Sequence, residues 1–328
     1  MEITAALKRK VLSFLEKKGY QLLKTNDLNE KIDYYRKVLI ETKIGTREQK
    51  IDSIVFSKDR AMQLHAFLKS FTQMASGTGN GTMYILYKAS NERDARSYKE
   101  LKEIFADGNF EFIEENDFRN QLIRICENST AQMIALYVDD VIITTKVDYG
   151  KIIHINPLEN VVSLGRGKEL DYSVVLKKKL VLPSFTRQPD GFEYFRWDYT
   201  DEYNDWTYPI GVGANFFDRD ELVVMLNGIP FNAPNSLETN LQVYKPMFIH
   251  RFGVCMEQIC CVAVHANLVQ TETVNPDLGT FSAEELLKRW EEGFMIDLDK
   301  FYGISGAVAQ LQAYEFIKRQ ATSLTVPV

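Results

Sequence analysis

The stretch that decides the fold is Ile134 to Thr144, which reads Ile-Ala-Leu-Tyr-Val-Asp-Asp-Val-Ile-Ile-Thr. Its apolar, partly β-branched flanks predict a strand that is buried on both faces. Two adjacent carboxylates, Asp139 and Asp140, interrupt the run, and an ionised carboxylate in a core is costly unless it is paired or bound to a metal. We therefore expect the strand to end at Val138, with the Asp pair at its carboxyl edge, where open α/β sheets bind ligands.

The chemistry of the Asp pair suggests a cation. Hard oxygen ligands of this kind suit Mg²⁺ or Mn²⁺ bridging a diphosphate. The alternative is a tight turn that carries two solvated aspartates. The rest of the chain bears on this choice.

The residues before the Asp pair alternate between strand and helix patterns. Apolar runs predict strands at Ile51–Phe56, Met83–Tyr87, Phe110–Ile113 and Ile134–Val138. Amphipathic patterns between them predict helices over 62–74, Tyr98–Phe105 and Phe118–Asn128. Alternation at this spacing implies parallel βαβ units, and so an α/β fold whose first half ends in the carboxylate pair.

A short polar elbow, Ser57-Lys58-Asp59-Arg60, joins the first strand to the first helix. Anions and nucleotides dock at helix N-termini, so this elbow is a candidate nucleotide contact. Asp59 taken alone could instead cap the helix.

Composition narrows the class of protein. The chain has 328 residues, of which 45% are hydrophobic and 26% charged, as in an ordinary globular protein. A net charge of −6 argues against a nucleic-acid partner. The four cysteines lack metal-ligand or disulfide spacing, which predicts buried reduced thiols. Because the sequence shows no membrane-span or signal-peptide pattern, we expect a cytoplasmic protein.

Both ends of the chain carry helical patterns. Residues 1–45 predict an N-terminal helical extension with a basic amphipathic helix, which could lie at the inner face of a membrane or pack on protein. Ser282 begins a capping box, and a last helix is expected over Ala307–Arg319. Residues 271–328 are therefore predicted to form a C-terminal helical extension.

The segment after the Asp pair offers weaker signals. Phe192–Trp206 mixes aromatic and acidic residues, which suits either carbohydrate binding or a β-hairpin with cross-strand aromatic pairs. Asn235 or Ser236 is expected to cap a helix that holds Glu238 in its first turn. His265 lies in a strand-like run and is a possible metal ligand.

In their order along the chain, these motifs resemble nucleotide-sugar glycosyltransferases of the A-type (GT-A) fold, and more narrowly a bacterial family 2-like group. The resemblance covers roughly residues 50–300 and rests on six segments: Phe56–Leu64, Val138–Asp140, Ser163–Gly167, Asp205–Pro209, Pro234–Glu238 and Phe281–Leu286.

The resemblance implies a Rossmann-like GT-A domain over 46–270, with a nucleotide-binding half (46–145) and an acceptor half (146–270). It implies a central mixed, mostly parallel sheet flanked by helices. The implied activity is a Mn²⁺- or Mg²⁺-dependent hexosyltransferase of glycan biosynthesis. Such an enzyme would move a sugar from a nucleotide diphosphate donor, with a UDP-sugar favoured, to a glycan or lipid-linked acceptor.

The resemblance also implies roles for the donor-side residues. Asp140 would ligate the metal, and Asp139 would contact the ribose or the metal. Asp59 and Arg60, in the elbow that begins at Ser57, would flank the nucleotide base or diphosphate.

On the acceptor side, Glu238 matches the place where inverting members of the fold carry their general base. His265 loosely matches a late metal ligand of several members.

Two departures from the family pattern keep other functions open. The chain reads Gly213-Ala214-Asn215 where the narrower group has an Asp-Gly-His-like sequence, and Tyr87–Ser90 lacks the carboxylate of many uridine-binding members. A nucleotidyltransferase would share strand-end carboxylates but would release pyrophosphate. A catalytically silent sugar- or protein-binding module on the same fold is the other alternative.

Overall fold

The computed structural model describes residues 47–174, 176–197, 204–267, 281–304, 310–311 and 314–319. These residues belong to one compact unit, Gly45–Val328. The predicted N-terminal extension over 1–45, with its membrane contact, lies outside the described residues. Among the residues that are described, every helix is too short or too polar to cross a bilayer.

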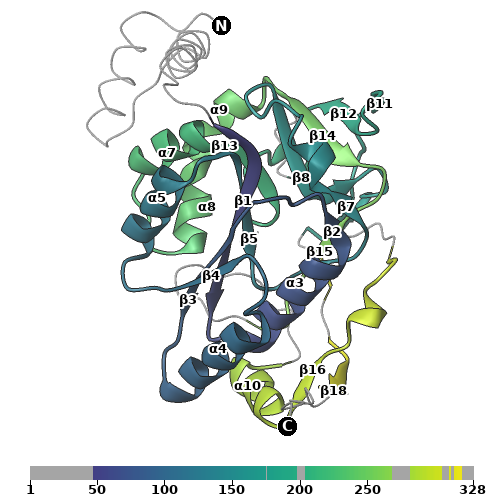
Figure 1. Cartoon of the computed structure of the whole chain (residues 1–328). Coiled ribbons are helices and arrows are strands. Elements are labelled where there is room, and N and C mark those ends of the chain that lie inside the picture. Colours follow the sequence, from purple (N-terminus) through teal and green to yellow (C-terminus); the bar gives the residue numbers. More distant parts are fainter. Residues whose placement is uncertain are drawn as a thin grey trace, which may run out of the picture. The chain divides into compact units, whose positions relative to one another are not determined.

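A nine-stranded sheet forms the centre of the unit (Figure 1). In spatial order its strands are β11 (Thr186–Arg187), β12 (Glu193–Arg196), β14 (Phe252–Met256), β8 (Asn160–Gly167), β13 (Asn215–Asp218), β5 (Ala131–Val138), β1 (Glu48–Lys58), β3 (Met83–Lys88) and β4 (Phe110–Glu114). β12 and β13 run in the direction opposite to the other strands of this sheet. The expected mixed, mostly parallel sheet is confirmed.

Helices flank the sheet in two groups. Figure 1 shows α3, α4 and α10 on one flank and α5, α7 and α8 on the other. This division follows from the strand order: right-handed crossovers from β1 to β3 and β4 put their helices on one face, and the return to β5 puts the next helix on the opposite face. The bounds are α3 (Ala61–Met74), α4 (Glu92–Ile104), α5 (Phe118–Asn128), α7 (Arg219–Asn227), α8 (Pro234–Leu241) and α10 (Ala283–Glu291).

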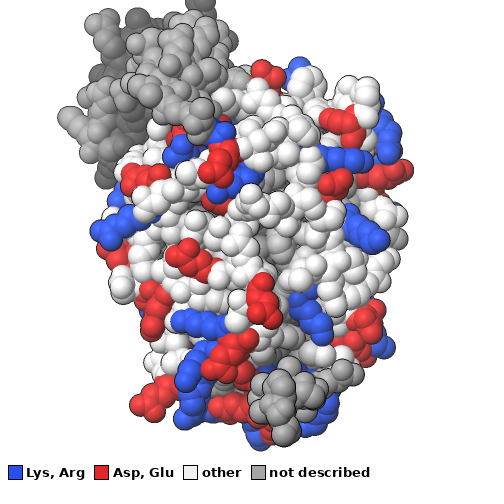
Figure 2. Space-filling model, in the orientation of Figure 1, with Lys and Arg blue, Asp and Glu red and all other residues white. Residues whose placement is uncertain are grey.

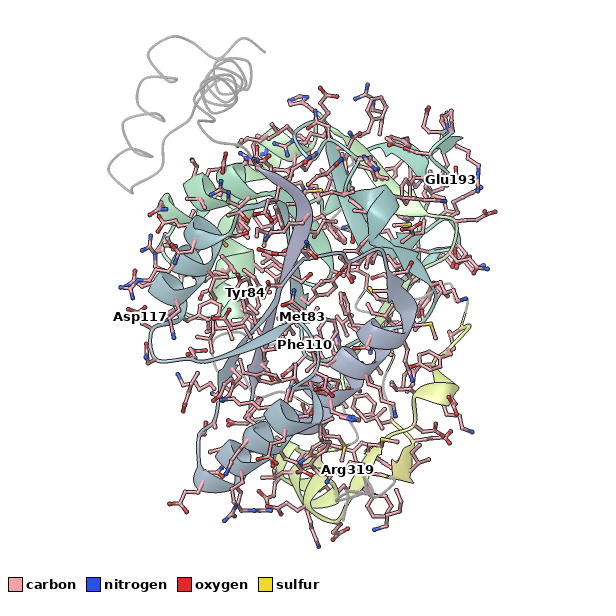
Figure 3. The ribbon with its side chains drawn as sticks, in the orientation of Figure 1. Met83, Tyr84, Phe110, Asp117, Glu193 and Arg319 are labelled. Carbon is pink, nitrogen blue, oxygen red and sulfur yellow. The ribbon has the colours of Figure 1, made fainter. Side chains whose placement is uncertain are left out.

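The parallel strands form the buried core. Seven consecutive residues of β1 and most of β5 are buried, as expected for strands covered by helices on both faces. Outward along the sheet, Met83 of β3 lies opposite Phe110 of β4, and Figure 3 shows the two side by side. All four cysteines are free and buried, which confirms that prediction.

Smaller elements complete the described unit. Short strands pair beside the main sheet: β2 (Ala75–Ser76) with β7 (Val147–Asp148), and β9 (Tyr172–Ser173) with β10 (Lys178–Lys179). A three-stranded sheet has β15 (Cys261–Val264) between β6 (Val141–Ile143) and β17 (Gln310–Leu311). The remaining short helices are α6 (Tyr149–Ile152), α9 (Lys245–Phe248), η1 (Asp205–Thr207), η2 (Gln242–Tyr244) and η3 (Leu298–Lys300).

Three aromatic residues of the segment 192–206 contribute to the core. Phe195 packs edge-on against Trp197 and Trp206, with ring centroids 4.8 and 5.0 Å apart, and all three side chains are buried. Edge-to-face pairs of this kind stabilise a core. The structure therefore favours the hairpin interpretation for these three rings, because buried rings offer no face to a sugar.

The C-terminal prediction is wrong in part. Helix α10 and its capping box at Ser282 are confirmed, but the residues of the expected helix Ala307–Arg319 that the structure describes form no helix. Instead, β17 pairs with β15, and β18 (Phe316–Lys318) pairs with β16 (Phe294–Ile296). Side-chain contacts also fix β18: Phe316 packs against Phe281, and the side chain of Arg319, which follows the strand, donates to the Trp290 carbonyl of α10.

The residues that cap helices α7 and α8 can be compared with the sequence pattern. Asp218 caps α7 by accepting hydrogen bonds from the backbone N–H groups of Asp220 and Glu221. The predicted cap of α8 is wrong: Ala233 is the N-cap, and the Ser236 hydroxyl, one turn in, accepts its backbone N–H. The first helical residue is Pro234, which suits that position because its missing N–H has no partner there anyway.

Candidate functional site

The direction in which the chain adds strands to the sheet changes between β1 and β5. The chain passes outward from β1 to β3 and β4, then returns to add β5 on the other side of β1. Adjacent parallel strands whose connections leave in opposite directions open a crevice at their carboxyl ends, where α/β sheets bind ligands. The elbow 57–60 and the Asp pair are the residues at those two strand ends. Phe56 lies opposite Val138, and the Asp139 N–H donates to the Phe56 carbonyl at 3.1 Å.

Arg60 joins the two carboxylates of the Asp pair. Its Nη1 atom lies 3.0 Å from Asp139 Oδ1 and 3.1 Å from Asp140 Oδ2. Its Nη2 atom donates to the Asn267 carbonyl at 2.5 Å, and Gln63 Nε2 donates to the Asn267 side chain at 3.1 Å. The guanidinium is thus held by strand ends that lie far apart in the sequence.

Charge and burial set the ionisation of this cluster. Burial raises the pKa of Asp139, with Arg60 opposing the rise and Asp140 adding to it. Burial alone would lower the pKa of Arg60, but the two carboxylates outweigh it and raise that pKa. The Asp139 Oδ2 atom is buried and has no hydrogen-bond partner among the described residues. An unpartnered buried carboxylate oxygen calls for a cation or a donor.

The rest of the elbow is also fixed in place. The Ser57 hydroxyl lies 2.7 Å from the Tyr98 hydroxyl, which also accepts the Arg60 backbone N–H at 3.2 Å. Asp59 does not cap α3: with φ of +53° it turns away, and its carboxylate accepts the Ser90 backbone N–H and hydroxyl, both at 2.7 Å. A non-glycine residue at positive φ is uncommon, and such strain gathers at functional sites.

A second carboxylate lies beside Asp59. Asp94, in the first turn of α4, is buried, and burial together with the Asp59 charge raises its pKa to about 6. The end of β3 therefore does have a neighbouring carboxylate. It comes from the helix and not from the residues directly after the strand, where we noted its absence.

Glu238 lies at the same sheet edge. Its carboxylate accepts the Tyr208 hydroxyl at 2.9 Å and the Val212 N–H at 3.3 Å. The loop that includes Val212 runs along the end of β5, since the Ala214 N–H donates to the Leu136 carbonyl at 2.7 Å. Burial raises the pKa of Glu238, while the hydrogen bonds from Tyr208 and Val212 oppose the rise.

His265 was expected within a strand, but it lies directly after one. It follows β15, next to Val264, whose N–H donates to the Asp140 carbonyl at 2.8 Å. Its backbone is therefore close to the Asp pair. Yet no three or more His, Cys, Asp or Glu side chains among the described residues are grouped so that they could hold a metal. Its role as a ligand stays a prediction.

The Asp pair nevertheless fits a divalent cation that is shared with a substrate. Mg²⁺ and similar ions are commonly bound through one or two carboxylates plus substrate phosphates, without an all-protein cage. Asp139 and Asp140 supply two such carboxylates, and the free Asp139 Oδ2 atom supplies an unsatisfied ligand oxygen. A metal held only when a diphosphate completes the shell is consistent with this donor set.

Sequence reasoning missed several residues of the site. Asn267, Tyr98 and Gln63 hold the elbow and Arg60 from three separate segments. Tyr314 is buried, and its hydroxyl donates to the Val264 carbonyl at 3.3 Å. Burial, followed by the Asp140 charge, raises the pKa of Tyr314. Asn267, Tyr98 and Tyr314 belong to no local motif, so only the tertiary structure reveals them. Gln63 lies within the segment Phe56–Leu64, but that segment gives no sign of its contact with Asn267.

The surface near this unit carries both signs of charge. On the face shown in Figure 2, Lys and Arg side chains are interspersed with Asp and Glu side chains. Interspersed charges give no strong long-range field of either sign over that face.

Comparisons with known proteins add one informative relative. No family model matches the chain. The bifunctional glycosyltransferase pgtA of Dictyostelium discoideum is 24% identical over 253 residues, which cover 70% of this chain and 32% of the relative. The chain thus spans about a third of the length of that relative. The similarity confirms the resemblance to glycosyltransferases.

Solved structures also align with the chain. A mannosyltransferase from Pyrobaculum calidifontis in complex with GDP-Man and Mn²⁺ aligns with TM-score 0.39 and 11% identity, over 73% of this chain and 65% of the other. A nucleotidyl transferase from Methanothermobacter aligns with TM-score 0.37 and 11% identity, over 64% and 89%.

Proposed function

We propose that this chain is a metal-dependent glycosyltransferase that moves a sugar from a nucleotide diphosphate donor to an acceptor hydroxyl. The observation that carries the proposal is the Asp pair bridged by Arg60 at the β1–β5 switch point. The similarity between this chain and the bifunctional glycosyltransferase, which covers 70% of this chain, supports the same function.

On the donor side, the elbow and the Asp pair would hold the nucleotide diphosphate. Asp139 and Asp140 would hold Mn²⁺ or Mg²⁺, which supplies positive charge against the diphosphate leaving group. Arg60 offers a planar guanidinium, whose donors match phosphate oxygens. Asp59, at a turn fixed by its hydrogen bonds with Ser90, would flank the nucleotide base or the diphosphate.

On the acceptor side, Glu238 would act as general base. It takes the proton of the acceptor hydroxyl, the hydroxyl oxygen bonds to the anomeric carbon, and the bond from that carbon to the diphosphate breaks. Direct displacement inverts the anomeric centre. The raised pKa of Glu238 favours this role, because a base works best when its pKa approaches the operating pH.

Several finer points belong to the same proposal. A UDP-sugar remains the favoured donor, and a glycan or lipid-linked molecule the favoured acceptor. Residues 1–45 would supply peripheral contact with the inner face of a membrane in a cytoplasmic protein, through their basic amphipathic pattern.

A ligand screen tests the proposal. The full chain is heated with a panel of nucleotide sugars and nucleoside triphosphates, in Mn²⁺ or in EDTA, because a ligand of the folded state raises the melting temperature. We expect stabilisation by nucleotide sugars in Mn²⁺ only, and release of a nucleoside diphosphate when an acceptor mixture is added.

Other outcomes would support the alternatives. Stabilisation by a triphosphate with release of pyrophosphate would indicate a nucleotidyltransferase. Stabilisation by free sugars or glycans, without any response to nucleotides, would indicate a silent binding module.

A further inference from the structure

We propose that Arg60 is a built-in counterion of the Asp pair, which keeps divalent metal from binding alone and makes metal binding depend on a diphosphate. This inference rests on the proposed function and deepens it. It concerns the order and coupling of ligand binding at the site.

The position of the guanidinium is the first support. A single atom, Arg60 Nη1, is within hydrogen-bond distance of both carboxylates, at 3.0 and 3.1 Å. It therefore occupies the place between Asp139 and Asp140 where a bridging cation would be attracted. A divalent ion that uses both carboxylates has to displace this contact or bind beside it.

The charges are the second support. Two carboxylates carry −2, and Arg60 reduces this to −1. An arginine side chain is always protonated in proteins, so the positive charge cannot be removed by losing a proton. A divalent ion that approaches the pair alone meets a fixed like charge at short range, in a site that is largely closed to water: the side chains of Arg60 and Asp139 are 10% and 4% exposed.

A diphosphate removes this conflict. The α3 helix begins directly after Arg60, and its N-terminus, which lacks a side-chain cap, favours an anion. Arg60 Nε is buried without a partner among the described residues, so the guanidinium has a spare donor for a phosphate oxygen. Once a diphosphate pairs with Arg60, the full charge of both carboxylates becomes available to the metal. The metal and the nucleotide then bind together.

The test measures Mn²⁺ binding to the full chain by titration calorimetry and by the loss of the free-Mn²⁺ paramagnetic resonance signal. Titrations are run with and without UDP or GDP. The variant is Arg60→Gln. The matched control is Arg93→Gln, since Arg93 also bridges two carboxylates, but these are Glu284 and Glu291 and not the Asp pair.

We expect Arg60→Gln to bind Mn²⁺ alone at least about tenfold more tightly than the native chain, because a like charge is removed. We also expect it to bind the nucleoside diphosphate more weakly and to lose most of the enhancement of Mn²⁺ binding by that ligand. Arg93→Gln should behave as the native chain. If Arg60→Gln does not fold, Arg60→Lys keeps the charge but not the fork, and should weaken the diphosphate effect at least severalfold.

Two results separate this inference from the proposed function. Metal-dependent binding of the diphosphate to the native chain, with the same Mn²⁺ affinity in Arg60→Gln or the same coupling in Arg60→Lys, would overturn the counterion role and leave the proposed function standing. Absence of diphosphate binding to the native chain in any metal would instead overturn the proposed function, and the inference with it.

Discussion

Replacing His65 with glutamine should remove one source of acid sensitivity from the fold. His65 lies on α3, is 5% exposed, and packs between Phe105 and Trp290 with ring centroids 5.8 and 5.3 Å away. Its Nδ1 atom has no partner among the described residues. Burial, followed by repulsion from Lys69 and Arg319, lowers the pKa of His65 to about 3.

The pKa difference fixes the size and direction of the effect. In the unfolded chain His65 titrates near its ordinary pKa of 6.5, so the unfolded state binds a proton that the folded state refuses. Above pH 6.5 His65 is neutral in both states, so it does not lower the free energy of unfolding. That free energy falls by roughly 1.4 kcal/mol per pH unit as the pH drops from 6.5 toward 3. Between pH 7.5 and pH 5, His65 alone should cost the folded state about 2 kcal/mol.

Urea denaturation at pH 7.5, 6 and 5 measures this cost. The native chain and His65→Gln are compared with His154→Gln, which changes an exposed histidine. We expect the loss of stability between pH 7.5 and 5 to be about 2 kcal/mol smaller in His65→Gln than in either other protein. Equal losses in all three proteins would refute the reasoning, whatever the absolute stability of the variant.

Two further predictions concern catalysis and the fold. Glu238→Gln should lower turnover by about 10²–10⁴-fold, since a general base is lost, while donor affinity measured by calorimetry stays unchanged. A parallel loss of donor binding would contradict its place on the acceptor side. Arg251→Ala should cost about 3–5 kcal/mol in denaturant unfolding, because Arg251 and Glu221 form a buried ion pair, with side chains 2% and 4% exposed, and Glu221 would lose its partner. A loss below 1 kcal/mol, roughly that of a surface pair, would contradict this.

The nucleotide-binding half was readable from the sequence because each of its elements has a strong local signal. Strands β1 and β5 are buried on both faces, so β5 appears as a nearly continuous apolar run and β1 as an apolar run interrupted by Asp52 and Ser53. The expected helix Phe118–Asn128 matches α5 at both ends, since Asp117 provides a side-chain cap and the apolar stripe is regular. The position of the Asp pair at the end of β5 followed from the cost of burying charge.

The tertiary contacts of the site could not be predicted from the sequence. The contact between Arg60 and the Asp pair joins residues about 80 positions apart, and its contact with Asn267 spans 207 positions. No local pattern encodes such pairings. The segment 307–319 was misread because its Ala, Gln and Leu residues favour a helix, whereas pairing with β15 and β16 imposes strands.

The most direct test of the central claim is the binding of nucleoside diphosphate to the native chain and to Asp140→Asn, measured by calorimetry in Mn²⁺ and in EDTA. The account predicts that Mn²⁺ tightens binding to the native chain at least about tenfold, and that Asp140→Asn, which keeps the side-chain size but removes one metal ligand, loses most of this gain. Equal affinity in Mn²⁺ and EDTA, or an undiminished gain in Asp140→Asn, would contradict it.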